Sequence, residues 1–383
     1  MTIRRIASAV AVTLCAQLFG AGGAATRQAG QPTPTRPAVP IDPFVGILDA
    51  FKSHSLVALG EGRHGNEQGH QFRLALIRDP RFAALVQDIV VEFGSARHQS
   101  AMDRFIQGGQ VSDQELRSAW QDTTQPHSIW DRPIYEEFFR AVRTINSALP
   151  RERRVRVLLG DPPLDWSRVR SEDDYNKLVS DNRNRYPFGV IQREVLAKKR
   201  RALIIYGDMH FVRRHALYNY DVSPALDGNS IVALLERHEP SRRVFTIWTN
   251  TTADLQQLQS DVSSWPTPAL ALLRGTVLGA ADFRFYNPTE MARYSFRDGK
   301  PDFSNPIPRD LWRPLQMEDQ FDATLYLGEP SSITIASVSP IVCEDAAYMA
   351  MRAKRAAAVG WAQDDLDRLR SFCADQLGRE GPR

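Results

Sequence analysis

Residues 55–65 read SLVALG followed by EGRHG, so the short apolar run Ser55–Gly60 leads directly into Glu61 and His64. Further short apolar runs end in the same way, at glycine or at polar residues: Asp88–Phe93, Val155–Gly160, Ala202–Gly207, Arg243–Thr249 and Ala323–Gly328. Continuous apolar runs of this length are typical of strands buried on both faces of a parallel sheet.

Helical patterns lie between these runs. One stretch has apolar residues at intervals of three and four, which places them on one helix face: Ile134, Phe138, Val142, Ile145 and Leu149. Ser112 and Glu115 have the spacing of a capping box. The alternation predicts an α/β fold with a mainly parallel sheet flanked by helices on both faces. The proline-rich stretch Phe285–Pro314 is expected to be a long surface excursion.

The first 24 residues have the features of a signal peptide. Arg4 and Arg5 precede an apolar stretch, Ile6–Phe19, and the small residues Gly22 and Ala24 offer a cleavage site. This stretch is shorter than the roughly 20 residues that a membrane-spanning helix needs, so no stable membrane span is expected after processing. The predicted localisation is periplasmic or secreted, and a retained anchor is the alternative.

The expected domain organisation follows from this beginning. Residues 25–43 are rich in Pro, Thr and Gln and are expected to be a flexible leader, and residues 44–383 are expected to form a single α/β domain. That domain ends in a helical hairpin over residues 344–378. Export favours a disulfide between Cys343 and Cys373, and two unpaired buried thiols are the alternative.

The composition of the 383-residue chain excludes several classes of protein. Hydrophobic residues make up 43% and charged residues 24%, as in globular proteins with a sizeable core. The 48 Lys and Arg nearly balance the 45 Asp and Glu, which gives a net charge of +3. This balance does not predict a nucleic-acid partner.

Chemistry-bearing side chains gather at the ends of the predicted strands. An acid ends or follows each of four runs: Glu61, Glu92, Asp161 and Asp208. Two of these turns add a histidine, at His64 and His210. Because the carboxyl ends of parallel strands meet at one edge of a sheet, we expect Glu61, His64, Glu92 and His210 to converge in one pocket.

These residue types suit acid–base catalysis. The unperturbed imidazole pKa is near 6.5, so a neutral His64 can take a proton from water, with Glu61 or Glu92 fixing its tautomer. His210 is expected to donate to a developing oxyanion or to the leaving group. Arg63 is a candidate for binding a substrate carboxylate, with an exposed salt bridge as the alternative. Asp161 and Asp208 are expected to hold loops and histidines in place.

The same residues allow other functional interpretations, of which only a metal site stays open. Gly60–Gly65 matches the dinucleotide fingerprint G-x-G-x-x-G, but Glu61 would stand where a pyrophosphate approaches the backbone. His64, Glu67 and His70 spell H-x-x-E-x-x-H, whose histidines point about 120° apart on a helix. No G-x-S-x-G motif is present, which disfavours a serine nucleophile. A divalent metal held by the four strand-end residues remains an open alternative.

At these residues the chain resembles a known family. Leu59–Gly65 followed by a helix, Val90–Glu92, Tyr206–His210 and Phe321–Leu327 are similar to motifs of the erythromycin esterase-like group in the ChaN/TIKI superfamily. The resemblance covers roughly Ser55–Gly328. Carried over position by position, it implies an active site of Glu61, His64, Glu92 and His210. Arg63 stands where many of these esterases have a smaller residue.

The resemblance implies a hydrolase that activates water with these histidines and glutamates, and the expected reaction is cleavage of a carboxylic ester or a related acyl bond. Its partner would be a small-molecule substrate. Export is expected from the signal peptide and departs from the family. The favoured interpretation requires no cofactor. The alternatives are a metal-dependent hydrolase or protease of the TIKI type, and a non-enzymatic haem- or metal-binding protein of the ChaN type.

Overall fold

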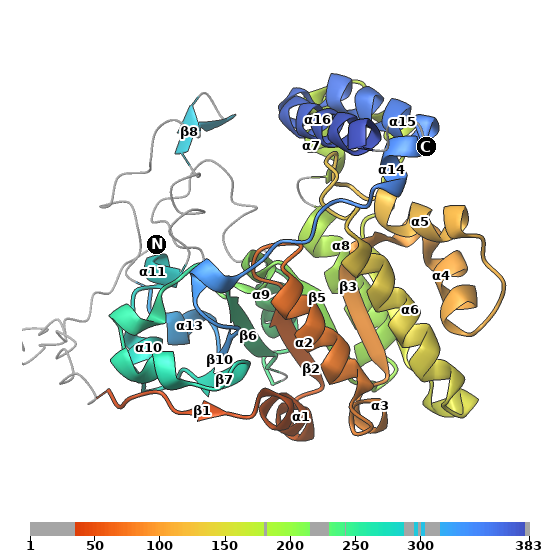
Figure 1. Cartoon of the computed structure of the whole chain (residues 1–383). Helices are drawn as coiled ribbons and strands as arrows, with labels where there is room; N and C mark the ends of the chain where they lie inside the picture. The colour runs from red at the N-terminus through yellow and green to blue at the C-terminus, as the bar shows by residue number, and fades with distance from the viewer. Residues whose placement is uncertain are drawn as a thin grey trace, which may run out of the picture. The chain divides into compact units, whose positions relative to one another are not determined.

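An eight-stranded sheet forms the centre of the protein, in the strand order β1-β7-β10-β6-β2-β5-β3-β4 (Figure 1). The computed structural model describes residues 35–179, 182–214, 230–241, 243–286, 295–297, 300–302 and 315–379. The expected signal peptide and most of the stretch Phe285–Pro314 lie outside these residues. Contacts join Thr35–Arg383 into one compact unit.

All six predicted strands are present and pair parallel in one continuous part of the sheet: β2 (Leu56–Gly60), β3 (Asp88–Ser95), β4 (Arg156–Asp161), β5 (Ala202–Tyr206), β6 (Phe245–Asn250) and β10 (Ala323–Tyr326). The predicted α/β fold with a mainly parallel sheet is therefore confirmed. Two further strands of this sheet were not predicted, β1 (Pro40–Ile41) and β7 (Ala269–Leu272), and both pair antiparallel at one edge. A four-residue apolar stretch such as β7 cannot be distinguished from a buried helix segment by periodicity.

Helices cover both faces of the sheet. The helices of the described residues, including those that lie away from the sheet, are α1 (Pro43–Ser53), α2 (Glu67–Arg78), α3 (Phe82–Leu85), α4 (Gln99–Ile106), α5 (Asp113–Gln121), α6 (Pro133–Ser147), α7 (Glu172–Val179), α8 (Asn182–Val190), α9 (Ile231–His238), α10 (Val277–Ala280), α11 (Phe283–Tyr286), α13 (Met317–Gln320), α14 (Ile341–Glu344), α15 (Ala346–Ala358) and α16 (Gln363–Arg379). A separate pair of strands, β8 (Ser295–Arg297) and β9 (Lys300–Asp302), forms a small second sheet. Among the described residues, no helix is both long and apolar enough to cross a membrane.

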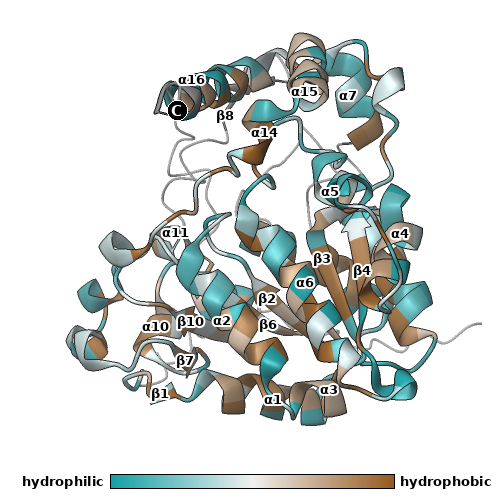
Figure 2. Ribbon diagram, turned by 45° about the vertical axis from the view of Figure 1, so that its right-hand side comes forward, coloured by the Kyte–Doolittle hydropathy of each residue, from teal (hydrophilic) through white to brown (hydrophobic). Residues whose placement is uncertain are grey.

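The two cores explain why the strands are continuously apolar. Val57 and Leu59 of β2 pack in the core beneath α1, α2 and α6, whereas Leu56 and Ala58 pack in the core on the opposite face, with α9. Successive side chains of a strand point to opposite faces, so a sheet with a core on each side needs apolar residues throughout. Figure 2 shows this apolar colouring along β3 and the more polar outer surface of α2 and α6.

Both helix signals in the sequence are confirmed. Ile134, Phe138, Val142 and Ile145 of the predicted apolar face fall in α6, where Phe138 and Val142 are buried, and Leu149 lies just beyond the end of this helix. Ser112 caps α5 by accepting a hydrogen bond from the backbone N–H of Glu115.

The expectation of a flexible leader does not hold over residues 38–43. Pro40–Ile41 pairs with β7, and the buried backbone of Ala38 exchanges hydrogen bonds of 2.7 and 2.9 Å with the Gln259 amide. A proline is tolerated in an edge strand, where its missing N–H would not face a partner. Proline-rich composition therefore could not exclude a strand here.

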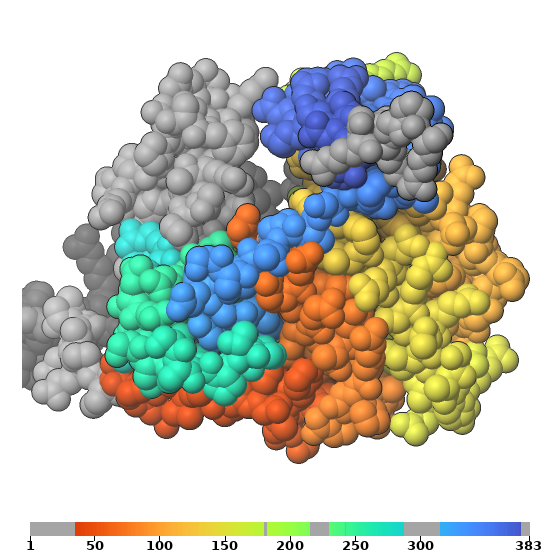
Figure 3. Space-filling view, viewed as in Figure 1, coloured from red at the N-terminus to blue at the C-terminus, as the bar shows by residue number. Residues whose placement is uncertain are grey.

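The carboxyl-terminal helices pack over the loop that joins α5 to α6. Ser128 donates its backbone N–H to Asp365, and Arg355 pairs with Asp122 at 2.8 Å. The connector from β10 to α14 runs along the start of α2, where Ala336 donates its backbone N–H to the Gly65 carbonyl (Figure 3). These contacts tie the end of the chain to the turn that follows β2.

The predicted hairpin and its disulfide are present. Helices α15 and α16 lie against each other, and Cys343 and Cys373, 30 residues apart in the sequence, are joined. The hairpin begins two residues later than predicted, because the residues from Ile341 to Glu344 form the separate short helix α14, and it ends one residue later, at Arg379.

Removing the disulfide should destabilise the protein. In the chain-entropy picture, a closed loop of this size contributes about 3 to 4 kcal/mol to the free energy of unfolding. We expect Cys343→Ser/Cys373→Ser to lose this amount in urea unfolding. Reducing agent should destabilise the wild type by a similar amount and leave the double variant unchanged; equal stability of the two proteins under oxidising conditions would contradict the prediction.

Candidate active site

A tight turn after β2 brings His64 back over Glu61. Gly62 has a φ of 67°, a left-handed conformation that favours glycine, and a Cβ there would lie 2.6 Å from a Thr251 methyl group. Asn66 closes the turn by donating to the carbonyls of Glu61 (2.6 Å) and Arg63 (2.7 Å) before it caps α2. As a result, His64 Nδ1 lies 2.8 Å from Glu61 Oε2.

Glu61 is fully buried and is held as an anion. Its other oxygen, Oε1, accepts hydrogen bonds from the Tyr135 hydroxyl at 2.9 Å and from Arg73 at 3.3 Å. Burial raises the pKa of this carboxyl, but the charge of Arg73 and the hydrogen bond to His64 outweigh it and leave the pKa below its usual value. A buried carboxylate with such partners is available to orient an imidazole.

His64 is the one partly exposed member of this group, with 26% of its side chain accessible. Burial lowers the pKa of its imidazole, but the hydrogen bond and the charge of Glu61 outweigh this and leave the pKa raised. The ring packs edge-on against Trp130, with centroids 4.7 Å apart. Because Nδ1 faces Glu61, Nε2 is left for a substrate or water, and no described residue hydrogen-bonds to it.

A second charged group forms around Glu92. Its Oε1 accepts from Arg183 at 2.7 Å and lies 3.2 Å from His210 Nε2, and its Oε2 accepts from the backbone N–H of Gly207 at 2.8 Å. Burial raises the pKa of Glu92, but the charges of His210, His64 and Arg183 outweigh it and leave the pKa well below its usual range. His210 Nδ1 lies 2.5 Å from the Asn184 side-chain oxygen, so both of its ring nitrogens have partners.

Gly207 lies where the two groups meet. A Cβ at this position would stand 3.2 Å from His64 Cε1, 3.4 Å from His64 Nε2 and 3.5 Å from Glu92 Oε2. The structure therefore brings all four predicted residues, Glu61, His64, Glu92 and His210, to one place at the carboxyl edge of β2, β3 and β5. The open nitrogen of His64 adjoins the anionic Glu92.

Asp208 and Asp161 lie beside this site and bind protein groups. Asp208 accepts backbone hydrogen bonds from Gly62 at 2.7 Å and Thr249 at 2.8 Å, which holds the His64 turn against the end of β6. Asp161 accepts from the backbone N–H of Thr124 at 2.7 Å and from its hydroxyl at 2.5 Å. Burial raises the pKa of each carboxyl to about 7.

Arg63 is exposed, and no described carboxylate forms a salt bridge with its guanidinium. Its backbone N–H donates to the Thr251 hydroxyl at 2.9 Å, so only its main chain is fixed. The Arg63 side chain thus forms no hydrogen bond or ion pair with the four grouped residues. Likewise, Glu67 and His70 turn to Thr334 and Glu137 and do not join His64.

Several residues of the site carry no local sequence signal. Arg73 and Tyr135 lie on the buried faces of α2 and α6. In the sequence, nothing distinguishes Tyr135 from an ordinary core residue. Arg183 and Asn184 come from the first turn of α8, which follows no predicted strand. Only the packing of these helices on the sheet brings them to Glu61, Glu92 and His210.

The arrangement does not fit a metal ion held by the four residues. Each carboxylate already accepts from an arginine, and a bound cation would have to displace or face these charges. Within the described part of the chain, no three His, Cys, Asp or Glu side chains are placed to hold one metal ion.

Comparisons with known proteins give distant structural likenesses. No protein-family profile and no curated protein matches the sequence. Solved structures that match include a succinoglycan biosynthesis protein (10% identity, TM-score 0.48, 79% of this chain and 96% of that one). A protein from Bacillus cereus has 10% identity and a TM-score of 0.45 over 79% and 96%. A mutant of the erythromycin esterase EreC in its open conformation has 11% identity and a TM-score of 0.46 over 77% and 95%. Likeness at this level carries no argument about activity.

The contact between His64 and Glu61 predicts how the imidazole titrates. We expect the His64 pKa to lie above the unperturbed value of about 6.5, and Glu61→Gln to lower it, because the neutral amide no longer favours the imidazolium. Proton–carbon NMR of the ring Cε1–H would measure both values, with His64→Ala identifying the signal. A higher His64 pKa in Glu61→Gln than in the wild type would contradict the assigned contact.

Proposed function

We propose that the protein is a hydrolase of a carboxylic ester or a related acyl bond, with His64 as the general base. The observation that carries the proposal is the pairing of a buried, ionised Glu61 with His64 Nδ1, which leaves Nε2 open. A carboxylate on Nδ1 fixes the tautomer whose Nε2 lone pair accepts a proton and stabilises the imidazolium that forms.

In the proposed reaction, His64 Nε2 takes a proton from a water molecule as the water oxygen attacks the acyl carbon. The acyl carbon–oxygen bond then breaks, and the imidazolium returns its proton to the leaving alkoxide. Glu61 remains ionised throughout, supported by Arg73 and Tyr135.

Arg183 is our candidate for binding the oxyanion or a substrate carboxylate. Its Nη2 donates to Glu92, and 30% of its side chain is exposed, while its other N–H groups have no described acceptor. A cation aimed at developing negative charge stabilises the transition state. His210, whose nitrogens are both engaged, is assigned to positioning Glu92, and this replaces the expected role as a proton donor. Arg63 is proposed to bind the outer part of the substrate.

The metal-dependent alternative has less support, because both carboxylates are already paired with arginines. The favoured mechanism uses protein groups only. A small molecule is the proposed substrate, and the proposed export rests on residues 1–24 of the sequence.

Substituting His64 tests the proposed base. We expect His64→Ala to lower kcat/KM for a responsive ester by about 10² to 10⁴, the scale of losing a general base, and Glu61→Gln to have a comparable effect. The assay would screen p-nitrophenyl esters and a macrocyclic lactone, with the exposed His238→Ala as the matched control. Chelator treatment of the wild type should change nothing. Full activity of His64→Ala on every ester that the wild type hydrolyses would refute the proposal; loss with chelator would favour the metal version.

The pH profile should report the same base. The pKa of His64 is raised, so its imidazole should become protonated at a higher pH than a free imidazole, whose pKa is about 6.5. We therefore expect kcat/KM to begin falling at a pH above this value as the solution is made more acidic. A profile of kcat/KM for the wild type between pH 5 and 9 checks this expectation. An acidic limb governed only by a group titrating near pH 4 would point to a carboxylate base instead.

A further inference from the structure

The opposite edge of the sheet carries a concentration of positive charge. Residues 151–156 read RERRVR and residues 198–201 read KKRR, and these segments lead into the parallel strands β4 and β5. Strand β3 lies between β4 and β5 in the sheet, so the two basic segments meet at its first residue, Asp88. In a chain with a net charge of only +3, this local excess requires an explanation.

The acids in this region neutralise only part of the charge. Asp88 is fully buried and accepts from Arg156 Nε at 2.7 Å and from Arg200 Nε at 2.7 Å, so two arginines share one carboxylate. Glu194 pairs with Arg156 and Lys198. No described carboxylate pairs with Arg151, Arg153 or Arg154.

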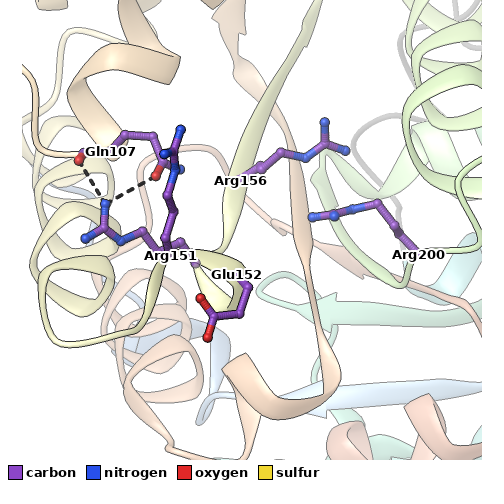
Figure 4. A pocket seen from close by; sticks show the side chains of 6 residues that line it. Gln107, Arg151, Glu152, Arg156 and Arg200 are labelled. Carbon is purple, nitrogen blue, oxygen red and sulfur yellow. Dashed lines mark hydrogen bonds between the residues drawn. The ribbon is translucent and has the colours of Figure 1, made fainter.

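A cavity of about 580 Å³ opens among these side chains (Figure 4). Its lining consists of four arginines with one amide and one carboxylate: Arg151, Arg154, Arg156, Arg200, Gln107 and Glu152. Arg154 is fixed by donating to the Gln107 carbonyl at 3.1 Å, and Arg156 by its bonds to Asp88 and Glu194. In Figure 4 the Glu152 carboxylate turns away from Arg156 and Arg200.

We propose that this cavity, which we call the basic cavity, is a binding site for an anion that carries several phosphate groups. The groups still able to donate come from separate arginines, Arg151, Arg154 and Arg200, so one small monovalent anion would not satisfy them together. Guanidinium groups match phosphate oxygens in a bidentate geometry, and a multivalent anion relieves the mutual repulsion of the arginines. The site lies at the amino ends of the strands, whereas His64 lies at the carboxyl ends, and it is therefore separate from the proposed hydrolytic site.

A neighbouring cavity gives the ligand room for more than phosphate. It measures about 480 Å³, shares Gln107 and Arg156 with the basic cavity, and includes Ile106, Leu158 and Tyr186 in its lining. A free polyphosphate and a nucleoside triphosphate both have a phosphate chain for the basic cavity. Only the nucleoside triphosphate also has a base, which could enter the neighbouring cavity.

Isothermal titration calorimetry at fixed ionic strength tests the proposal with sodium tripolyphosphate, ATP without metal, and inorganic phosphate. We expect saturable binding of tripolyphosphate that is at least about tenfold tighter than that of inorganic phosphate. Arg151→Gln should weaken it by about tenfold, and Arg151→Glu by more. The matched control is Arg170→Gln, a substitution of an exposed arginine beyond the carboxyl end of β4, and it should bind tripolyphosphate as the wild type does.

The comparison of ATP with tripolyphosphate identifies the source of the phosphate groups. Tighter binding of ATP would identify a nucleotide as the ligand, and equal binding of the two would identify a free polyphosphate.

The outcomes separate a built site from general attraction. Absence of saturable tripolyphosphate binding would overturn the proposal, as would equal weakening in Arg151→Gln and Arg170→Gln, which would show non-specific attraction. Inorganic phosphate binding as tightly as tripolyphosphate would refute the multivalent ligand. His64→Ala should retain full binding, so the result is independent of the proposed hydrolysis.

Discussion

The buried carboxylate of Glu61 is the constraint on which the site depends. An ionised carboxyl removed from water is costly unless cations and hydrogen-bond donors surround it. Here the donors come from three elements: Arg73 from α2, Tyr135 from α6 and His64 from the turn after β2. Satisfying this one charge therefore fixes how two helices approach the first strand of the parallel core and which way the His64 ring faces.

The same requirement is repeated at Glu92 and Asp88, with different consequences. Glu92 shares its charge with Arg183 and His210, and together with Glu61 it makes the carboxyl edge of the sheet a balanced set of opposite charges around an open imidazole nitrogen. At the amino edge, Asp88 is satisfied by two arginines, and no described carboxylate pairs with Arg151, Arg153 or Arg154. One edge of the sheet thus carries paired charges around His64, and the other holds a surplus of hydrogen-bond donors.

The carboxyl-terminal segment supports the site from a distance. The connector after β10 bonds to Gly65, and helices α15 and α16 bind the loop of residues 122–131 through Asp122, Ser128 and Asp131. That loop carries Trp130, whose ring packs against His64. The orientation of His64 therefore depends on residues that are distant in the sequence. One example is Asp365, which binds Ser128 of this loop across a separation of 237 residues.

The sequence by itself determined the six parallel strands, the sheet type and the four grouped residues. Runs such as Ser55–Gly60 must be buried on both faces, and parallel strands that share a carboxyl edge must bring Glu61, His64, Glu92 and His210 together. Only the tertiary structure decided what these residues can do. Arg73, Tyr135 and Arg183 occupy helices whose periodicity specifies which face is buried but not which side chain meets which carboxylate. Their pairing sets the ionisation of Glu61 and Glu92, leaves Nε2 of His64 open, and engages both nitrogens of His210, because the free energy of a buried charge depends on partners that are close in space and distant in sequence.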